Sequence, residues 1–252
     1  MLLFQKIRPT NYSQYAIWGK CGNDLRHNEN NWFDISRLKY NRPASKGGSA
    51  TYFGTPVQRS FVTDTMRCYF SFPTVKTLIY KNDINKGKTP TGGFTDHYVF
   101  RLAETYLMRA EAYYWMGNAV GAKNDVNEIR RRAKAPELPS VTLDDILDER
   151  ARELYIEEHR KVELTRIAFL KAQLGKDVYS LSNFAEKNWY YDRVMEKNNF
   201  FAEQYFYSTN AFIMKPYHVL WPVPLTAITS NTQGRINQNI GYFGAEDNIP
   251  VE

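Results

Sequence analysis

The sequence predicts a mainly α-helical protein in which tetratricopeptide-like helical hairpins carry a large, irregular, loop-rich lobe. Apolar residues recur at helical spacing in the middle of the chain, between about Val99 and Leu170. The sequence on both sides is rich in Gly, Asn and Pro, the residues that turns require. A Gly117-Asn118 pair divides the helical stretch, and this pair is typical of a helix end.

Three helices are expected in series. The first begins near Arg101 and ends at Gly117, and the second runs from about Ala119 to Arg132. Small residues on both allow close approach, as in tetratricopeptide-type hairpins; they are Ala110, Ala112, Ala119 and Ala122. Thr142 and Asp145 have the spacing of a capping box, which predicts a third helix from about Leu143 to Leu170.

The domain organisation is predicted as one domain over residues 1–252. Residues 1–98 are expected to form the loop-rich lobe and residues 99–171 the helical core. Residues 172–252 are expected to form an irregular C-terminal segment that packs on the helices, since Pro222 and Pro224 favour extended chain there.

The net charge of +6 does not indicate nucleic-acid binding, because the basic residues are scattered along the chain. The densest run, residues 130–132, lies at an expected helix end, where cations complement the helix dipole. No apolar run is long enough for a membrane-spanning helix, and residues 1–10 do not read as a signal peptide. Whether Cys21 and Cys68 pair is left open by the sequence.

Glu149, Glu153 and Glu157 recur every four residues among arginines. A glycosidase needs two carboxyl groups with separated pKa values on either side of a cleft. Carboxylates on successive turns among arginines more simply form ion pairs, so we expect a scaffold here. The four histidines lack metal-ligand spacing, and no nucleophile or cofactor motif occurs. The sequence therefore predicts no enzyme, no metal site and no cofactor.

Four blocks of the chain match the motifs of one family. They lie in residues 101–112, 127–132, 149–166 and 222–242. In the last block the matching residues are Pro222, Val223, Pro224, Asn231, Gln238, Asn239, Gly241 and Tyr242. Together the blocks resemble the SusD/RagB family of outer-membrane nutrient-binding lipoproteins. The chain departs from the family pattern at Glu158, Glu163 and Ile240, where Gly, Asp and Pro are usual.

The resemblance covers the C-terminal half of the family, whose members are longer and carry a lipidated N-terminal Cys. It implies a non-catalytic, surface-exposed protein of the cell outer membrane, with the lipid anchor inferred from the family alone. Such a protein binds an oligosaccharide or polysaccharide and delivers it to a SusC-like TonB-dependent transporter. The alternative is a tetratricopeptide-like module that docks on a transporter or a peptide and has no sugar site.

A sugar-binding surface needs flat aromatic faces beside hydrogen-bonding groups. Aromatic and hydrogen-bonding side chains are most concentrated between residues 12 and 32, and we expect this group to bind the ligand. The group consists of Tyr12, Tyr15, Trp18, Asn23, Asp24, Arg26 and Trp32. We expect the ligand to meet an exposed ring, Trp32 first and Trp18 second. The alternative is that both tryptophans are buried anchors of the loops. Residues 189–191, with the sequence Trp-Tyr-Tyr, are a weaker candidate.

Overall fold

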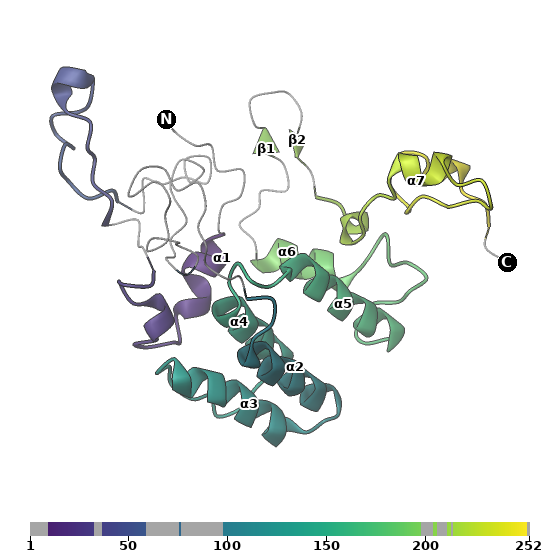
Figure 1. The fold of residues 1–252 in the computed structure, drawn as a ribbon, viewed down its shortest axis with the longest axis horizontal. Helices are drawn as coiled ribbons and strands as arrows, with labels where there is room; N and C mark the ends of the chain where they lie inside the picture. The colour runs from purple at the N-terminus through teal and green to yellow at the C-terminus, as the bar shows by residue number, and fades with distance from the viewer. Residues whose placement is uncertain are drawn as a thin grey trace. The chain divides into compact units, whose positions relative to one another are not determined.

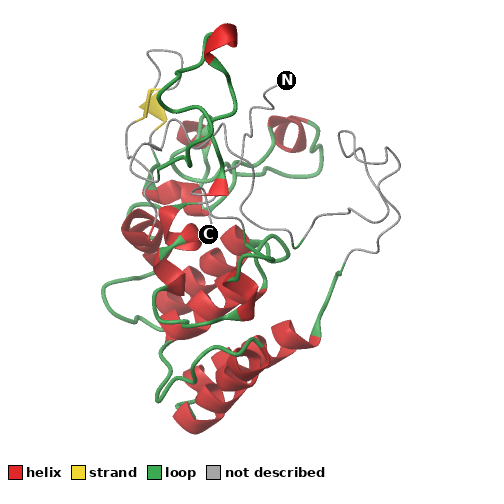
Figure 2. Ribbon diagram, turned by 90° about the vertical axis from the view of Figure 1, so that its left-hand side faces the viewer, coloured by secondary structure: helices red, strands yellow, loops and turns green. Residues whose placement is uncertain are grey.

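The structure is a computed structural model that describes residues 10–32, 37–58, 76, 98–197, 204–205, 211–212 and 214–250. The described residues are mostly helix and loop, with one short pair of strands (Figure 2). The predicted mainly α-helical class is therefore confirmed. The chain divides into two compact units, residues 1–158 and 159–252, and each is described by itself. The assignment of all residues to a single domain stays a prediction.

The first unit holds four α-helices and three short 3-10 turns among its described residues (Figure 1). The α-helices are α1 (Asn11–Gln14), α2 (Leu102–Trp115), α3 (Ala119–Arg132) and α4 (Leu143–Glu153). The 3-10 turns are Ala16–Trp18, Leu25–His27 and Ala44–Lys46. The described part of the expected loop-rich lobe, residues 1–98, thus consists of loops, short 3-10 turns and the four-residue helix α1.

Helices α2 and α3 form the predicted hairpin. Gly117 adopts a positive φ of 76°, which ends α2, and the Asn118 side chain accepts a hydrogen bond from the Gly121 amide at 2.9 Å, which starts α3. The two helices and α4 share one apolar core, which contains Leu107, Ala110, Val126, Ile129 and Ile146. This core positions the charged ends of α3 and α4 beside the N-terminal loops.

Helix α4 begins with the predicted capping box. The Asp145 amide donates to Thr142 Oγ1 at 3.2 Å, and the Thr142 amide donates to Asp145 Oδ2 at 2.9 Å. The predicted length of this helix is wrong, however. It ends at Glu153, and α5 begins at Arg160, so the expected helix from Leu143 to Leu170 is two helices.

The break between α4 and α5 occurs at Ile156, which has a positive φ of 68°. That conformation is costly for a β-branched residue, so contacts elsewhere must stabilise it. Glu157 Oε2 lies 2.7 Å from Arg101 Nε, and Glu158 Oε1 lies 2.5 Å from Arg150 Nε. These ion pairs hold both residues after the break.

The second unit contains α5 (Arg160–Gln173), α6 (Trp189–Lys197) and α7 (Leu225–Thr229). Strands β1 (Gln204–Tyr205) and β2 (Ala211–Phe212) pair antiparallel, with Gln204 opposite Phe212. Two 3-10 turns follow α6, Pro216–Val219 and Ala245–Asp247. On α5, Ile167 and Ala168 are buried, and the Phe169 ring stacks on Phe184 at a centroid distance of 4.3 Å.

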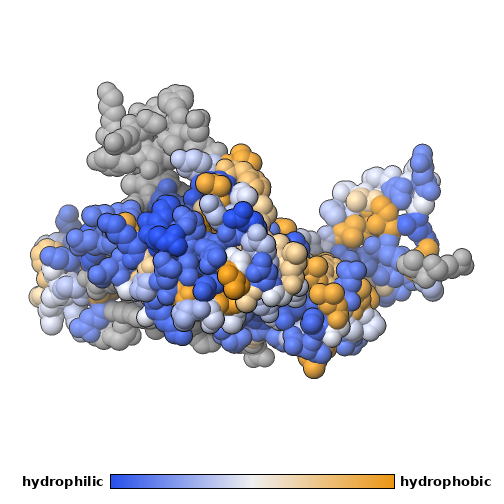
Figure 3. All heavy atoms as spheres, turned by 90° about the horizontal axis from the view of Figure 1, so that it is seen from below, coloured by the Kyte–Doolittle hydropathy of each residue, from blue (hydrophilic) through white to orange (hydrophobic). Residues whose placement is uncertain are grey.

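Polar residues cover most of the described surface in Figure 3, with apolar patches between them. Several large apolar side chains of the α2–α3 hairpin are exposed, among them Leu102, Met116 and Val120. Among the described helices, none combines the length and the apolar character needed to cross a bilayer.

Substituting Gly121 by Ala should destabilise the first unit. The added Cβ would lie 2.7 Å from the Tyr113 ring and 2.8 Å from Asn118 Nδ2, so the hairpin must shift. Because three atoms lie within 3.0 Å of the added Cβ, we expect overpacking to cost about 2–3 kcal/mol, which leaves a net loss of about 1–2 kcal/mol after the roughly 1 kcal/mol that Ala gains over Gly in a helix. Urea denaturation measures the change. Val120→Ala, at an exposed neighbouring position, is the control and should stay within about 0.5 kcal/mol. Equal stability of Gly121→Ala and the native chain would contradict this packing.

Candidate functional site

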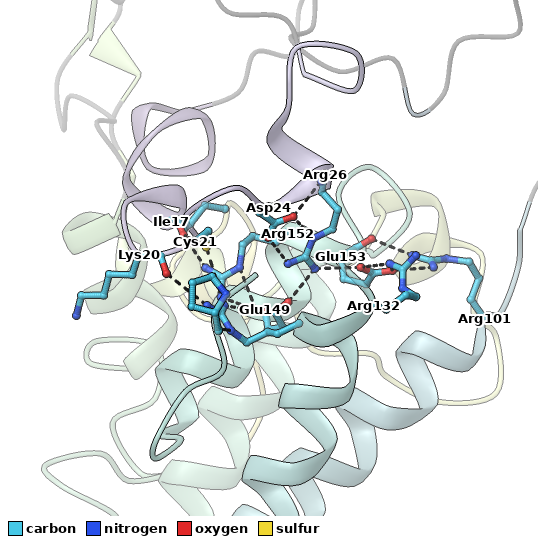
Figure 4. Close-up of polar contacts among 12 residues, drawn as sticks. Ile17, Lys20, Cys21, Asp24, Arg26, Arg101, Arg132, Glu149, Arg152 and Glu153 are labelled. Atoms are coloured by element: carbon cyan, nitrogen blue, oxygen red, sulfur yellow. Dashed lines mark hydrogen bonds and ion pairs between the residues drawn. The ribbon is translucent and has the colours of Figure 1, made fainter. Parts of the chain in front are cut away.

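A buried ion-pair network joins the N-terminal loops to the helices of the first unit (Figure 4). Its centre is Glu149 on α4, which is fully buried. Glu149 Oε1 lies 2.8 Å from Arg26 Nη1. Its other oxygen lies 2.9 Å from Arg130 Nη1 and 2.7 Å from Arg152 Nη2. One carboxylate thereby connects a loop residue, the end of α3 and its own helix.

Glu153, one turn further along α4, is the second centre. Its carboxylate lies 3.0 Å from Arg26 Nη1, 2.9 Å from Arg101 Nη1 and 2.7 Å from Arg132 Nη2. Asp24 completes this side of the network, since its Oδ2 lies 2.6 Å from Arg26 Nη2. Arg101 immediately precedes α2, so the network reaches all three long helices of the unit.

Two arginines of the network also bind backbone carbonyls. Arg152 Nη1 donates to the Ile17 carbonyl at 2.6 Å, and Arg130 Nε donates to the Pro136 carbonyl at 2.7 Å. The same two side chains thus hold the loop before residue 20 and the loop after α3. Backbone carbonyls outside helices and sheets need hydrogen-bond partners, and the two arginines supply such partners for these loops.

Electrostatics keep the buried carboxyl groups ionised. Burial acts to raise the pKa of Glu149, but the nearby charges of Arg152, Arg26 and Arg130 hold that pKa below its ordinary value. For Glu157, burial likewise acts to raise the pKa, but hydrogen bonds from Lys76 and Arg101 bring that pKa below its ordinary value. Ionised, multiply paired carboxylates are a scaffold, as the sequence predicted for this stretch.

A cluster of aromatic rings lies beside the network. The Trp18 ring stacks on His27 at a centroid distance of 4.4 Å, and Trp32 lies 5.4 Å from Trp18. Tyr155, in the turn after α4, lies 5.3 Å from Trp32. Burial raises the pKa of Tyr155 to about 12. Trp18 also donates its indole N–H to the Ser13 carbonyl at 3.0 Å, which fixes the ring in the cluster.

A cavity of about 310 Å³ opens where the aromatic cluster meets the network. Its lining residues are Trp18, Arg26, Asn31, Trp32, Lys76, Tyr98, Arg101, Arg132, Arg152, Glu153, Tyr155 and Glu157. This volume is at the lower end of ligand pockets, so it has room for one small ring rather than a chain of several. The walls combine aromatic carbon with cationic hydrogen-bond donors.

The expectation that Trp18 and Trp32 present exposed rings is wrong. Trp18 is 7% exposed and Trp32 is 5% exposed, and both belong to the apolar core of the loops. With few regular elements in this region, the large rings supply the buried area that helices supply elsewhere. Both tryptophans and Arg26 nevertheless line the cavity. A ligand there would meet parts of these rings that the cluster leaves uncovered.

The other predicted site residues have different roles. Asp24 is 3% exposed, and its carboxylate forms an ion pair with Arg26. The Tyr12 hydroxyl donates to Asp148, which ties the first helix to α4. Tyr15 is half-buried and Asn23 is exposed, and neither lines the cavity. Their part in ligand binding stays a prediction.

Residues 189–191, the weaker candidate, form the first turn of α6. Tyr190 is buried, and the Arg193 guanidinium lies over the Trp189 ring at 5.4 Å. These rings therefore pack within the second unit.

Sequence reasoning missed Tyr98. Its ring is 68% exposed, and it borders both the cavity and a second hollow of about 510 Å³ along α2. Its position three residues before Arg101, which the network holds, was the available signal.

Cys21 is a buried free thiol whose sulfur lies 3.4 Å from the Ile17 carbonyl oxygen, and Cys68 lies outside the described residues. Within the part of the chain that the structure describes, no group of three or more potential metal ligands occurs.

Substituting Glu149 by Gln should destabilise the protein strongly. The change leaves the guanidinium groups of Arg26, Arg130 and Arg152 without their shared counter-charge in a buried setting. Breaking a buried pair on one side typically costs about 3–5 kcal/mol. Glu128→Gln is the matched control, because Glu128 pairs with Arg131 on the exposed surface, where a pair contributes about 0–1 kcal/mol. Similar losses in the two variants, measured by chemical denaturation, would refute the central role of Glu149.

The stability of the protein should also fall in acid. Because the folded-state pKa values of Glu149 and Glu157 lie below their ordinary value of 4.5, the unfolded chain binds protons first. The stability contributed by these groups is complete above pH 4.5 and is lost as the pH falls through the lower folded-state pKa values. Denaturation midpoints between pH 7 and pH 3 measure this loss. The Glu149→Gln variant should show a shallower decline, and a decline as steep as that of the native chain would contradict the assignment.

Comparison with known proteins gives this architecture a family. The model of the SusD family matches residues 8–242. The starch-binding protein SusD of Bacteroides thetaiotaomicron is 29% identical over 169 residues, which are 67% of this chain and 25% of that relative. The chain therefore spans about a quarter of the length of the curated relative that it matches. With its hairpin, its charged α4 and its C-terminal motif all inside the matched range, the chain belongs to the SusD family.

Proposed function

We propose that this protein is a glycan-binding subunit that is displayed at the outer membrane. It holds an oligosaccharide for a SusC-like TonB-dependent transporter and does not cleave it. The observation that carries the proposal is the family match over residues 8–242, together with a relative whose name is starch-binding protein. The family is associated with the outer membrane, which supports the location.

The state of two carboxyl groups, Glu149 and Glu157, supports binding without cleavage. A glycosidase keeps one carboxylic acid protonated near neutral pH by raising its pKa. At Glu149 and Glu157 the neighbouring cations lower the pKa instead. These groups are therefore acceptors of permanent ion pairs, and proton donation to a leaving group is not their role.

The cavity of the first unit supports a sugar site on its outer edge. Tyr98 offers an exposed aromatic face, and Asn31 is exposed beside it in the lining. Arg132 holds Glu153 with one nitrogen while its side chain remains 60% exposed. A ring that stacks on an aromatic face and accepts hydrogen bonds from amide and guanidinium groups matches this combination.

A second role is favoured by the hairpin. Leu102 on α2, Met116 directly after it and Val120 on α3 are each more than half exposed. A tetratricopeptide-like hairpin by itself cannot bury its apolar faces, and stacking against a neighbour covers them. These side chains therefore favour docking of a protein partner on the hairpin, which is compatible with sugar binding elsewhere.

Calorimetry with a panel of purified oligosaccharides, starting with maltoheptaose, tests the proposal. We expect saturable heat with at least one neutral or acidic oligosaccharide. A reducing-end assay on the same mixtures should detect no new ends. Absence of heat across the panel would contradict glycan binding, whereas the appearance of new reducing ends would contradict the non-catalytic role.

Substituting Tyr98 by Ala should weaken oligosaccharide binding and leave stability unchanged, because the ring is exposed. Loss of one stacking ring costs about 1–3 kcal/mol by analogy with bases stacked on aromatic side chains, which is roughly 5- to 150-fold in Kd. Tyr98→Phe should keep most of the affinity. Tyr114→Ala, on α2 and outside the cavity lining, is the control. An unchanged Kd for Tyr98→Ala would remove Tyr98 from the site.

A further inference from the structure

The second unit presents a tryptophan to solvent. Trp221 is 69% exposed, in contrast to Trp18 and Trp32, which are buried. It lies between the 3-10 turn Pro216–Val219 and α7, in a segment with no regular hydrogen bonding of its own. An exposed indole can mark a binding site, but single exposed apolar residues are also common in loops. The contacts around Trp221 distinguish the two cases.

The backbone around Trp221 is held at every residue from 218 to 221 and at 223. Lys161 Nζ and Thr165 Oγ1 on α5 donate to the His218 and Val219 carbonyls at 2.8 and 3.1 Å. The Tyr242 hydroxyl donates to the Leu220 carbonyl at 2.8 Å. Asn239 Nδ2 donates to the Trp221 carbonyl at 2.6 Å. Side chains, rather than a helix or sheet, therefore fix the position of this indole.

Gln238 completes the attachment on the far side of the indole. Its side chain accepts from the Val223 amide at 2.7 Å and donates to the Val223 carbonyl at 2.9 Å. Gly241 allows Tyr217 to approach, since a Cβ there would lie 2.3 Å from the Tyr217 ring. The C-terminal motif noted in the sequence thus has a physical role. Its Gln, Asn, Gly and Tyr residues fasten the segment that carries Trp221.

One face of the indole is backed by a cation. Lys161 Nζ lies 3.8 Å from the centroid of the Trp221 ring. Burial lowers the pKa of Lys161. An ammonium group has three N–H donors, of which one goes to His218. The result is a flat apolar surface that is held rigidly beside an amine and the amide of Asn239. A rigid aromatic surface loses little conformational entropy when it binds.

We propose that Trp221 is a stacking platform for one pyranose ring of a carbohydrate ligand, which stacks on the indole face opposite Lys161, with Asn239, which binds the Trp221 carbonyl, as a neighbouring hydrogen-bonding group. The proposal rests on the glycan-binding function proposed above, and it adds a contact in the second unit that is independent of the cavity beside Tyr98. The ligand class follows from the chemistry, because a sugar ring has one apolar face and a rim of hydroxyl groups that these side chains complement.

The test measures oligosaccharide affinity by calorimetry for the native chain and for Trp221→Ala, Trp221→Phe and Phe243→Ala. Trp221→Ala should raise Kd by roughly 5- to 150-fold, and Trp221→Phe should recover most of the affinity. Phe243 is the matched control, since it is an 89% exposed aromatic residue of the same unit. Its backbone receives no side-chain hydrogen bond among the described residues, and Phe243→Ala should bind as the native chain does. Melting temperatures of all variants should agree, which shows that each is folded.

A second readout uses the five tryptophans of the chain. Bound oligosaccharide should protect the native protein from acrylamide quenching, and it should protect Trp221→Phe far less. Native-like affinity in Trp221→Ala would overturn the platform while leaving the glycan-binding function intact. No binding by the native chain would overturn both. Equal losses in Trp221→Ala and Phe243→Ala would identify a general apolar patch and would also overturn the platform.

Discussion

The first unit depends on the two adjacent carboxylates of α4. Glu149 and Glu153 are almost completely buried, and removing them from water carries a cost that only close pairing offsets. Arg26 contacts both, Arg130 and Arg152 contact the first, and Arg101 and Arg132 contact the second. Every long helix of the unit and the N-terminal loops are thereby attached to α4. Loops with so little regular hydrogen bonding could not otherwise be fixed.

The buried charges of this network have a structural role, and the ligand contacts proposed above involve other side chains. Glu149 and Glu153 each pair with three arginines, which gives both carboxylates a structural role. In the proposed function, recognition is left to Tyr98 beside the cavity and Trp221 in the second unit. A protein that captures a ligand and releases it unchanged needs such a division, since a rigid framework reduces the entropy lost when the ligand binds.

The aromatic residues show that residue type alone does not identify a binding face. Trp18 and Trp32 lie in the loop region that looked most suitable for sugar, yet they stack with His27 and Tyr155 to form a small core. Trp221 lies in a motif of prolines and amides, yet its ring is exposed. The difference is set by neighbours that are distant in sequence. Trp18 and Trp32 are covered by rings from other parts of the first unit. Trp221 has Lys161 against one face of its ring, and Asn239 binds its backbone carbonyl rather than its ring.

The sequence by itself determined the helical class, the α2–α3 hairpin, the capping box at Thr142, the charged pairing of α4 and the family, because each depends on local spacing. Only the tertiary structure decided where α4 ends, because the left-handed Ile156 is stabilised by ion pairs to Glu157 and Glu158 that periodicity does not encode. It also decided which tryptophans are buried. Burial depends on contacts between residues far apart in the chain, such as Trp32 with Tyr155 and Trp221 with Lys161, and a single sequence does not specify those distances.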